Sequence, residues 1–468
     1  MLFVEPRFFV FFAIVFALYW SLKRNTQRKV VLLVASYIFY GAWDPRFTAL
    51  LAFSTLFDYG AGLAMEAASG QRRRKLIILF SVSVNLTLLF TFKYFNFFAD
   101  SFVGLLHAAG VQANPVTVRL ILPVGISFYT FQSLSYTLDI YRGHMHARRS
   151  LLDYATFVGF FPQLVAGPIV RAYDFLPQLD ELKRFSAVAV RPAVILFFFG
   201  YVKKACVSDN VAPYVDLVFS HPGDYSGASI VAATVLYAIQ IYCDFSGYTD
   251  MAIATAKLLG YDLTVNFRHP YFSTSISDFW RRWHISLSSW LRDYLYIPLG
   301  GNRGGRLGAY RNLMITMVLG GLWHGASWNF VIWGALHGGA LILHKEYARH
   351  RPAAWTGQPA YQAGAMLLTF WWVCLAWIFF RSTSLPLAAE IARDFVTMSG
   401  TGAGDIATGA APAILGLLLI HALESRRLIS GALLALERRA FYALAGAASG
   451  AALALTPIAY RPFIYFQF

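Results

Sequence analysis

Apolar segments long enough to cross a lipid bilayer recur along this chain, and their recurrence restricts the fold more than any other feature. In the N-terminal third they are predicted at residues 6–22, 30–43, 46–66, 76–95 and 120–141. Hydrophobic residues make up 57% of the sequence, whereas soluble domains contain about 45–50%. Because backbone groups in lipid must form their hydrogen bonds internally, such segments cross as helices. The sequence therefore predicts an all-α polytopic membrane protein with about 11–13 membrane helices.

Basic residues gather in the loops after the first, third and fifth segments, at residues 23–29, 71–75 and 142–149. Lys and Arg are enriched in cytoplasmic loops, so these three loops are predicted to face the cytoplasm. The same pattern explains the net charge of +15, from 39 Lys+Arg against 24 Asp+Glu. No nucleic-acid motif accompanies the charge, so membrane lipids are expected partners and nucleic acid is not.

The remaining segments are less regular but show no linker long enough to separate folded domains, so we expect one membrane domain over residues 1–468. Pro162, Gly167 and Pro168 interrupt residues 151–170, which predicts a kinked or re-entrant piece. The chain has three cysteines, Cys206, Cys243 and Cys374. Their spacing fits neither a disulfide framework nor a metal site, so no metal is expected.

Charged residues, histidines and glycines are concentrated in residues 273–330. From Ile276 to Leu295 the apolar residues keep the helical i, i+3, i+4, i+7 spacing, and Ser275 with Asp278 forms a capping-box pattern. This predicts one amphipathic helix along the membrane interface, with His284 at the border between its two faces. Its polar face carries three arginines, Arg281, Arg282 and Arg292.

A second unusual segment ends in a histidine flanked by glycine. The apolar run of residues 313–323 reaches only about half of a roughly 30 Å hydrocarbon core, and His324 follows it. Residues 312–344 are too long for one span and too short for two, so a break is predicted at residues 320–325. An ionisable group placed deep in a bilayer indicates a functional site, although a lone histidine is ordinarily a packed core residue. A second histidine at position 284 shifts the balance toward function.

Two carboxylates, Asp244 and Asp250, follow another apolar segment. We expect them to pair with the three arginines of the central helix, because a buried unpaired acid stays neutral. The alternative is that they carry protons.

Two blocks of the central stretch, DFWRRWHISLSSWLRDYLYIPLGGNRGG and LGGLWHGASWNF, resemble the signature blocks of the membrane-bound O-acyltransferase (MBOAT) family, in its bacterial branch of alginate-type polysaccharide O-acetyltransferases. The blocks LPVGISFYTFQSLSYTLDIYRG, FFPQLVAGPIVR and IYCDFSGYTDMAIATAKLLGY extend the resemblance over roughly residues 1–345. It implies a single MBOAT domain with a catalytic core at about residues 120–345 and helices around a central funnel or tunnel. It also implies that His324 is catalytic and that His284 is the second candidate.

Acyl transfer from a thioester to a sugar hydroxyl needs a base, donors for the developing oxyanion and exclusion of water. His324 fits the base, because burial keeps histidine neutral. His284, the Trp283 N–H or a backbone amide near Gly325 is expected at the oxyanion. Trp283, Trp323 and Gly325 are predicted to bind the substrate. The three arginines suit the phosphates of coenzyme A or, equally, lipid headgroups. No nucleophile motif is present, so direct transfer is expected.

The family resemblance favours one hypothesis, an enzyme of the bacterial inner membrane that transfers acetyl groups from cytoplasmic acetyl-CoA to hydroxyls of an exported, alginate-like polysaccharide. The transfer would be direct or through a periplasmic acetyltransferase partner, with no bound cofactor. A neighbouring branch with the same Trp-His-Gly block implies a second hypothesis, D-alanyl transfer to teichoic acid from a carrier protein. The third is a non-enzymatic transporter whose histidines relay protons.

Overall fold

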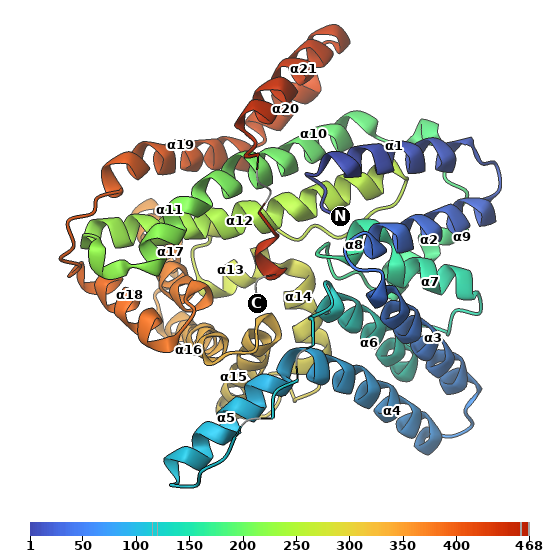
Figure 1. Cartoon of the computed structure of the whole chain (residues 1–468), viewed down its shortest axis with the longest axis horizontal. Coiled ribbons are helices and arrows are strands. Elements are labelled where there is room, and N and C mark those ends of the chain that lie inside the picture. Colours follow the sequence, from blue (N-terminus) through green and yellow to red (C-terminus); the bar gives the residue numbers. More distant parts are fainter. Residues whose placement is uncertain (115, 119, 459–460, 467–468) are drawn as a thin grey trace. The chain divides into compact units, whose positions relative to one another are not determined.

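Every regular element is helical in the part of the chain that this computed structural model describes, residues 1–114, 116–118, 120–458 and 461–466 (Figure 1). Among these described residues, five helical segments are long and apolar enough to cross a membrane: Arg46–Ala67, Gln71–Ala108, Gly227–Leu258, Pro359–Arg381 and Ala407–Ser425. A shorter apolar helix covers Pro6–Ser21. These features confirm an all-α polytopic membrane protein, and the larger helix count stays a prediction.

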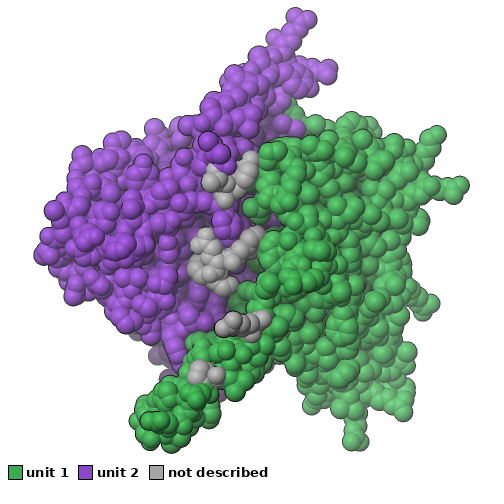
Figure 2. Space-filling view, viewed as in Figure 1, with its two compact units in different colours: residues 1–193, 252–264 green, residues 194–251, 265–468 purple. Residues whose placement is uncertain are grey.

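Contacts within the chain divide it into two compact units, coloured separately in Figure 2. Unit 1 contains residues 1–193 and 252–264, and unit 2 contains residues 194–251 and 265–468. All the predicted site residues belong to unit 2. The single membrane domain stays a prediction.

The helices of unit 1 follow the predicted apolar segments closely. They are α1 (Pro6–Ser21), α2 (Asn25–Gly41), α3 (Arg46–Ala67), α4 (Gln71–Leu89), the π-helical η1 (Phe90–Tyr94), α5 (Phe95–Ala108), α6 (Ile126–Arg142), α7 (Leu151–Gly159), α8 (Phe161–Leu164), α9 (Ala172–Asp180) and the turn η2 (Phe185–Ala187). The fifth predicted segment begins later than expected, at Ile126. The interruption predicted within residues 151–170 is present, because α7 ends at Gly159 and Pro162 lies in the first turn of α8.

A buried polar cluster helps to join α3 and α4 within unit 1. Asp58 on α3 is 0% exposed and accepts hydrogen bonds from Ser81 Oγ at 2.9 Å and Asn85 Nδ2 at 3.0 Å. Helix α6 packs on the same side of α3, where a Cβ atom at Gly62 would lie 2.8 Å from the Tyr136 ring. The three helices are therefore held by both polar pairing and close approach.

Unit 2 holds the longer helices and the central stretch. Its elements are α10 (Val190–Tyr201), the π-helical η3 (Val202–Ser208), α11 (Asp209–Ser220), η4 (Pro222–Asp224), α12 (Gly227–Leu258), η5 (Pro270–Phe272), α13 (Ile276–Arg282), α14 (Ile285–Leu291), the π-helical η6 (Arg292–Tyr296), α15 (Gly305–His324), α16 (Trp328–His350), η7 (Ala353–Trp355), α17 (Pro359–Arg381), α18 (Leu385–Thr397), α19 (Ala407–Ser425), α20 (Leu428–Ala435), α21 (Arg438–Leu455) and η8 (Ile464–Phe466). Helix α10 begins in unit 1, and the last turns of α12 belong to unit 1.

Helices α15 and α16 form a hairpin whose backbones touch. A Cβ atom at Gly321 would lie 2.1 Å from the Phe330 carbonyl oxygen, and one at Gly334 would lie 2.3 Å from the Met317 carbonyl oxygen. Only glycine permits this approach. The hairpin therefore fixes the place of the residues at its tip, which include His324.

The prediction of one helix over residues 276–295 is wrong, because the chain breaks at His284. Helix α13 ends at Arg282 and α14 begins at Ile285, and His284 has the left-handed conformation φ 42°, ψ 55°. The backbone groups released by the break find partners upstream, since Ile285 N–H donates to Asn266 O at 3.0 Å and Arg268 N–H donates to Arg282 O at 2.9 Å. The predicted cap is present, with Ser275 Oγ accepting from Asp278 N–H at 3.1 Å.

The break predicted at residues 320–325 lies slightly later. Helix α15 continues through Gly320 and Gly321 to His324, and α16 begins at Trp328. The glycines thus serve the close helix contact and do not end the helix. The depth of His324 in a bilayer stays a prediction.

Candidate active site

Two buried histidines that are far apart in the sequence come together in unit 2. The ring centroids of His284 and His324 lie 6.5 Å apart, and the two residues are 0% and 3% exposed. The Trp323 ring lies beside both, 5.0 Å from His324 and 6.0 Å from His284. The fold therefore places the two predicted catalytic residues in one buried cluster.

Asn266 fixes the tautomer of His284. Its side-chain oxygen accepts from the Ser286 backbone N–H at 3.1 Å and from the Ser286 hydroxyl at 3.0 Å, and it lies 3.2 Å from His284 Nδ1. Because a backbone N–H can only donate, this oxygen is an acceptor and His284 Nδ1 carries the proton. Burial lowers the pKa of His284 to about 3, so the ring stays neutral with its lone pair on Nε2. This tautomer suits accepting a hydrogen bond better than donating one to an oxyanion.

His324 lies at the last position of α15, enclosed by aromatic rings. Besides Trp323, the rings of Trp333, Phe380 and Tyr465 have centroids 5.0, 5.3 and 5.4 Å from that of His324. These rings come from α16, α17 and η8. The cage shields the imidazole from water, since His324 is only 3% exposed.

Gly325 allows the chain to turn directly after His324. A Cβ atom there would lie 2.0 Å from the Phe330 ring, and the Gly325 N–H donates to the Gly321 carbonyl oxygen at 3.4 Å. The glycine is thus a packing requirement of the site.

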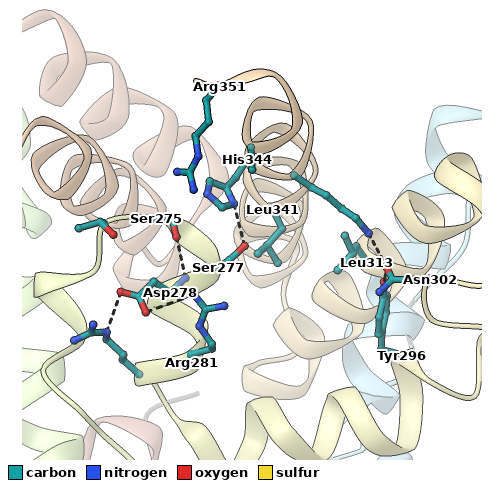
Figure 3. Close-up of a pocket in the computed structure, with 14 residues that line it drawn as sticks. Ser275, Ser277, Asp278, Arg281, Tyr296, Asn302, Leu313, Leu341, His344 and Arg351 are labelled. Atoms are coloured by element: carbon teal, nitrogen blue, oxygen red, sulfur yellow. Dashed lines mark hydrogen bonds and ion pairs between the residues drawn. The ribbon is translucent and has the colours of Figure 1, made fainter. Parts of the chain in front are cut away.

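A basic pocket of about 750 Å³ opens beside α13 and α16, and Figure 3 shows its side chains. It is lined by Thr274, Ser275, Ser277, Asp278, Arg281, Arg282, Tyr296, Asn302, Leu313, Leu341, His344, Lys345, Ala348 and Arg351. Four of these side chains are cationic and one is a carboxylate, so the pocket is positively charged. It is large enough for a cofactor-sized anion.

Polar contacts organise the pocket without neutralising it. The single carboxylate, Asp278, pairs with Arg282 at 2.9 Å and more loosely with Arg281 at 3.7 Å. Lys345 Nζ donates to the neutral Asn302 side chain at 2.6 Å. Burial, together with the charges of Arg351 and Arg281, lowers the pKa of His344, whose Nδ1 lies 3.1 Å from Ser277 Oγ (Figure 3). The remaining positive charge favours phosphate groups.

One face of α16 runs from the histidine cluster to the basic pocket. Trp333 contacts His324, the His337 ring lies 4.6 Å from Trp333, and Leu341 and His344 line the pocket. From Trp333 to His344 the helix rises by about 16 Å. The funnel or tunnel itself stays a prediction.

The predicted binding residues separate into two groups. Arg281 and Arg282 line the basic pocket, but Arg292 does not and pairs with Asp293 at 2.7 Å. Trp283 packs in an aromatic core, stacked on Phe279 with ring centroids 5.5 Å apart. Assigning these residues to substrate binding stays a prediction.

Sequence reasoning missed several residues around the site. No role in the site was predicted for Lys345 and Arg351, although with His344 they line the pocket. The helical spacing of residues 337, 341, 344, 348 and 351 was the signal that could have placed them on one face. The roles of Asn266 and Tyr465 had no local signal, since both arise from tertiary packing.

The expected partners of the two carboxylates are wrong. Asp244 pairs with Lys204 at 2.7 Å, and Asp250 pairs with Lys203 at 2.6 Å. The arginines of the central helix pair with acids on their own turns, at Asp278 and Asp293. Pairing itself was predicted correctly, and η3 supplies its cations because glycines bring it close: Cβ atoms at Gly200 and Gly247 would each lie 2.6 Å from the other residue's carbonyl oxygen.

A polytopic helical membrane protein with two buried histidines beside a basic pocket is the class that this fold and site define. The chain belongs to the MBOAT, membrane-bound O-acyltransferase family, whose sequence profile matches residues 32–385. The protein is therefore a membrane O-acyltransferase.

Three curated relatives show which members of this family the chain is similar to. The chain is 42% identical over 394 residues to the "Probable alginate O-acetylase" of Pseudomonas putida, covering 82% of this chain and 77% of the relative. It is 36% identical over 433 residues to the peptidoglycan O-acetyltransferase of Helicobacter pylori, covering 86% and 80%. A teichoic acid D-alanyltransferase of Streptococcus thermophilus is 26% identical over 276 residues, covering 54% and 65%.

Proposed function

We propose that the protein transfers acetyl groups from cytoplasmic acetyl-CoA to hydroxyl groups of an exported polysaccharide of the alginate type, in the bacterial inner membrane. The observation that carries the proposal is that one face of α16 joins a basic pocket to a caged pair of histidines. Coenzyme A has anionic phosphates at one end and the thioester at the other, so it matches this polarity. The names of the relatives that are more than 35% identical support the acetyl group.

In the proposed reaction, His324 takes the proton from the acceptor hydroxyl as its oxygen attacks the thioester carbonyl carbon. The new C–O bond forms, the C–S bond breaks, and the coenzyme A thiolate leaves. His284 Nε2, as an acceptor, would orient an N–H or O–H donor in the cluster. The aromatic cage limits competing hydrolysis. No covalent acyl-enzyme is needed.

The donor side is expected at the basic pocket, where Arg281, Arg282 and Arg351 would hold the phosphates. The acceptor would reach His324 from the extracytoplasmic side, either as the polysaccharide itself or as a hydroxyl of a periplasmic partner. Only the acetyl group would then cross the membrane.

The test uses inverted membrane vesicles that contain the full chain and radiolabelled acetyl-CoA, with unacetylated alginate oligosaccharide enclosed in the vesicles. Wild type should label the oligosaccharide, and His324→Ala should lose at least about 100-fold of the rate at equal protein level. Transfer from a D-alanyl carrier but not from acetyl-CoA would overturn the proposal that acetyl-CoA is the donor. Full activity of His324→Ala would overturn the catalytic role.

A further inference from the structure

Residues 461–466, which include the turn η8, form part of the wall around His324 within unit 2. Figure 1 draws η8 in red near α12 and α15, and ring contacts agree with that position. Phe463 is 0% exposed and Ile464 is 4% exposed. This segment follows α21 in the chain, and Tyr465 packs against rings from α12, α15 and α17, which lie far upstream. Such burial needs specific anchors.

A buried ion cluster anchors the main chain of this segment. The Ile464 N–H donates to Asp244 Oδ2 at 2.7 Å, and Lys204 Nζ donates to the Arg461 carbonyl oxygen at 3.3 Å. Lys204 also pairs with Asp244 and Asp209, each at 2.7 Å, and all three side chains are at most 4% exposed. Buried charges persist only when they are paired and hydrogen-bonded. The cluster therefore depends on residues 461–466 for two of its hydrogen bonds.

A second ion pair anchors the start of the segment. Arg461 pairs with Asp216 at 2.5 Å, and Asp216 also pairs with Arg381 at 2.6 Å. Arg381 directly follows Phe380, a ring of the cage around His324. The anchors on α11 and α17 thus tie residues 461–466 to the same helix that helps to form the cage.

These anchors direct Tyr465 against the catalytic cluster. Its ring centroid lies 5.4 Å from His324, 4.6 Å from Phe245 and 6.0 Å from Phe380. Phe245 in turn packs edge-on against His284 at 4.6 Å. Tyr465 is the only member of the described cage contributed by residues 461–466.

We propose that Tyr465 limits the size of the acyl group held at His324, and that Asp244 is a positioning residue that keeps Tyr465 in place. The inference rests on the proposed acyl transfer at His324. With its ring centroid 5.4 Å from that of the reacting imidazole, Tyr465 would collide with a long acyl chain before it met a short one. In a hydrophobic pocket, each methylene changes discrimination by roughly 10- to 200-fold. Removing the ring should therefore relax the choice of acyl group without removing the base.

The experiment measures dissociation constants of acetyl-CoA and butyryl-CoA for the purified full chain in lipid nanodiscs, which requires no acceptor. Wild type should prefer acetyl-CoA, and Tyr465→Ala should shift the ratio of the two constants by about tenfold or more toward butyryl-CoA. Tyr465→Phe keeps the ring and should keep the wild-type ratio. Tyr465→Leu gives an intermediate shift and replaces the alanine variant if that variant does not fold.

A matched pair of charge variants separates positioning from general stability. Asp244→Asn loses the charge that holds the Ile464 N–H, so it should shift the ratio in the same direction as Tyr465→Ala. Asp209→Asn removes a carboxylate from the same lysine, but Asp209 accepts no hydrogen bond from the backbone of residues 461–466 in the described structure and senses them only through the charge of Arg461. Its ratio should therefore stay close to that of wild type. Equal shifts in both variants would mean a non-specific packing effect and would overturn the positioning role.

The role of Tyr465 and the identity of the donor can be overturned separately. A wild type that binds acetyl-CoA, combined with unchanged ratios in Tyr465→Ala and Tyr465→Leu, overturns the role of Tyr465 and leaves the proposed donor intact. A wild type that binds neither acyl-CoA overturns the proposed donor, and the inference falls with it.

Discussion

The side-chain oxygen of Asn266 lies 3.2 Å from His284 Nδ1 and also accepts from both the backbone and the hydroxyl of Ser286. One amide therefore orients the imidazole, selects its tautomer and closes the backbone break between α13 and α14. The left-handed conformation of His284 is strained for a residue with a side chain, and such strain is concentrated at functional sites. The histidine ring is thus held by the break instead of by a continuous helix.

Replacing Asn266 by alanine should reduce the rate of acyl transfer by a larger factor than it reduces the amount of folded protein. The change removes the acceptor from a fully buried imidazole N–H, which costs about 1–3 kcal/mol, roughly 5- to 150-fold in rate if it acts on the transition state. The measurement is the initial rate of acetyl transfer in vesicles, normalised to folded protein. If the normalised rate of the variant equals that of wild type, Asn266 has only a structural role.

Asn266→Asp should make acyl transfer sensitive to acid. A carboxylate beside Nδ1 stabilises the imidazolium, so the pKa of His284 should rise from about 3. Because the ring is protonated below its pKa, the variant should lose activity as the pH falls through the raised value, while wild-type His284 stays neutral over the same range. A pH–rate profile of the variant that matches wild type would show that the charge of His284 does not matter to the reaction.

Alanine at Gly321 or Gly325 should stop acyl transfer even though both histidines are present. The added Cβ would lie 2.1 Å from the Phe330 carbonyl oxygen or 2.0 Å from the Phe330 ring, so the hairpin must shift. Overpacking of this kind costs about 1–3 kcal/mol and would displace His324. Gly339→Ala is the matched control, because it lies on α16 with nothing within 4 Å of the new Cβ. Normal transfer by Gly325→Ala would contradict the expected fit.

Hydropathy predicted the helices of unit 1 because each apolar segment is a local signal that ends in charge or glycine. The break at His284 had no such signal, since neither glycine nor proline occurs in the sequence Trp283-His284-Ile285-Ser286. Its cause is Asn266, which is 18 residues upstream and satisfies the exposed backbone only in the folded chain. Local propensity favoured a helix, and tertiary hydrogen bonding decided otherwise.

Residues of the candidate site were predictable from sequence where their residue type is rare in its surroundings. His284, His324 and Arg281 were found because charge and imidazole are rare in apolar sequence. The predicted partner of Asp244 was wrong because several cations could reach it, and the close contact between Gly200 and Gly247 brings η3 with Lys204 near it. Long-range packing of that kind leaves no trace in periodicity or composition.

The loops at residues 23–29, 71–75 and 142–149 should all face the cytoplasm. Single cysteines introduced as Arg24→Cys, Arg73→Cys or His146→Cys lie at exposed positions. An impermeant thiol reagent should label them in inverted vesicles and not in intact cells. Labelling of any of the three from outside intact cells would contradict the orientation and, with it, the cytoplasmic supply of the donor.

Neutralising the basic pocket should weaken donor binding and leave the chemical step almost unchanged. The double variant Arg281→Gln, Arg351→Gln removes two of the four cationic side chains that line the pocket but touches neither histidine. Each lost charge-assisted hydrogen bond is worth about 1.5–3 kcal/mol, so KM for acetyl-CoA should rise by at least about tenfold with kcat nearly constant. Arg292→Gln is the control, because Arg292 pairs with Asp293 outside the pocket and its loss should leave KM unchanged. A fall in kcat at constant KM would mean that these arginines act on the chemical step and do not bind the phosphates. An equal rise of KM in Arg292→Gln would mean that the effect comes from a general loss of surface charge.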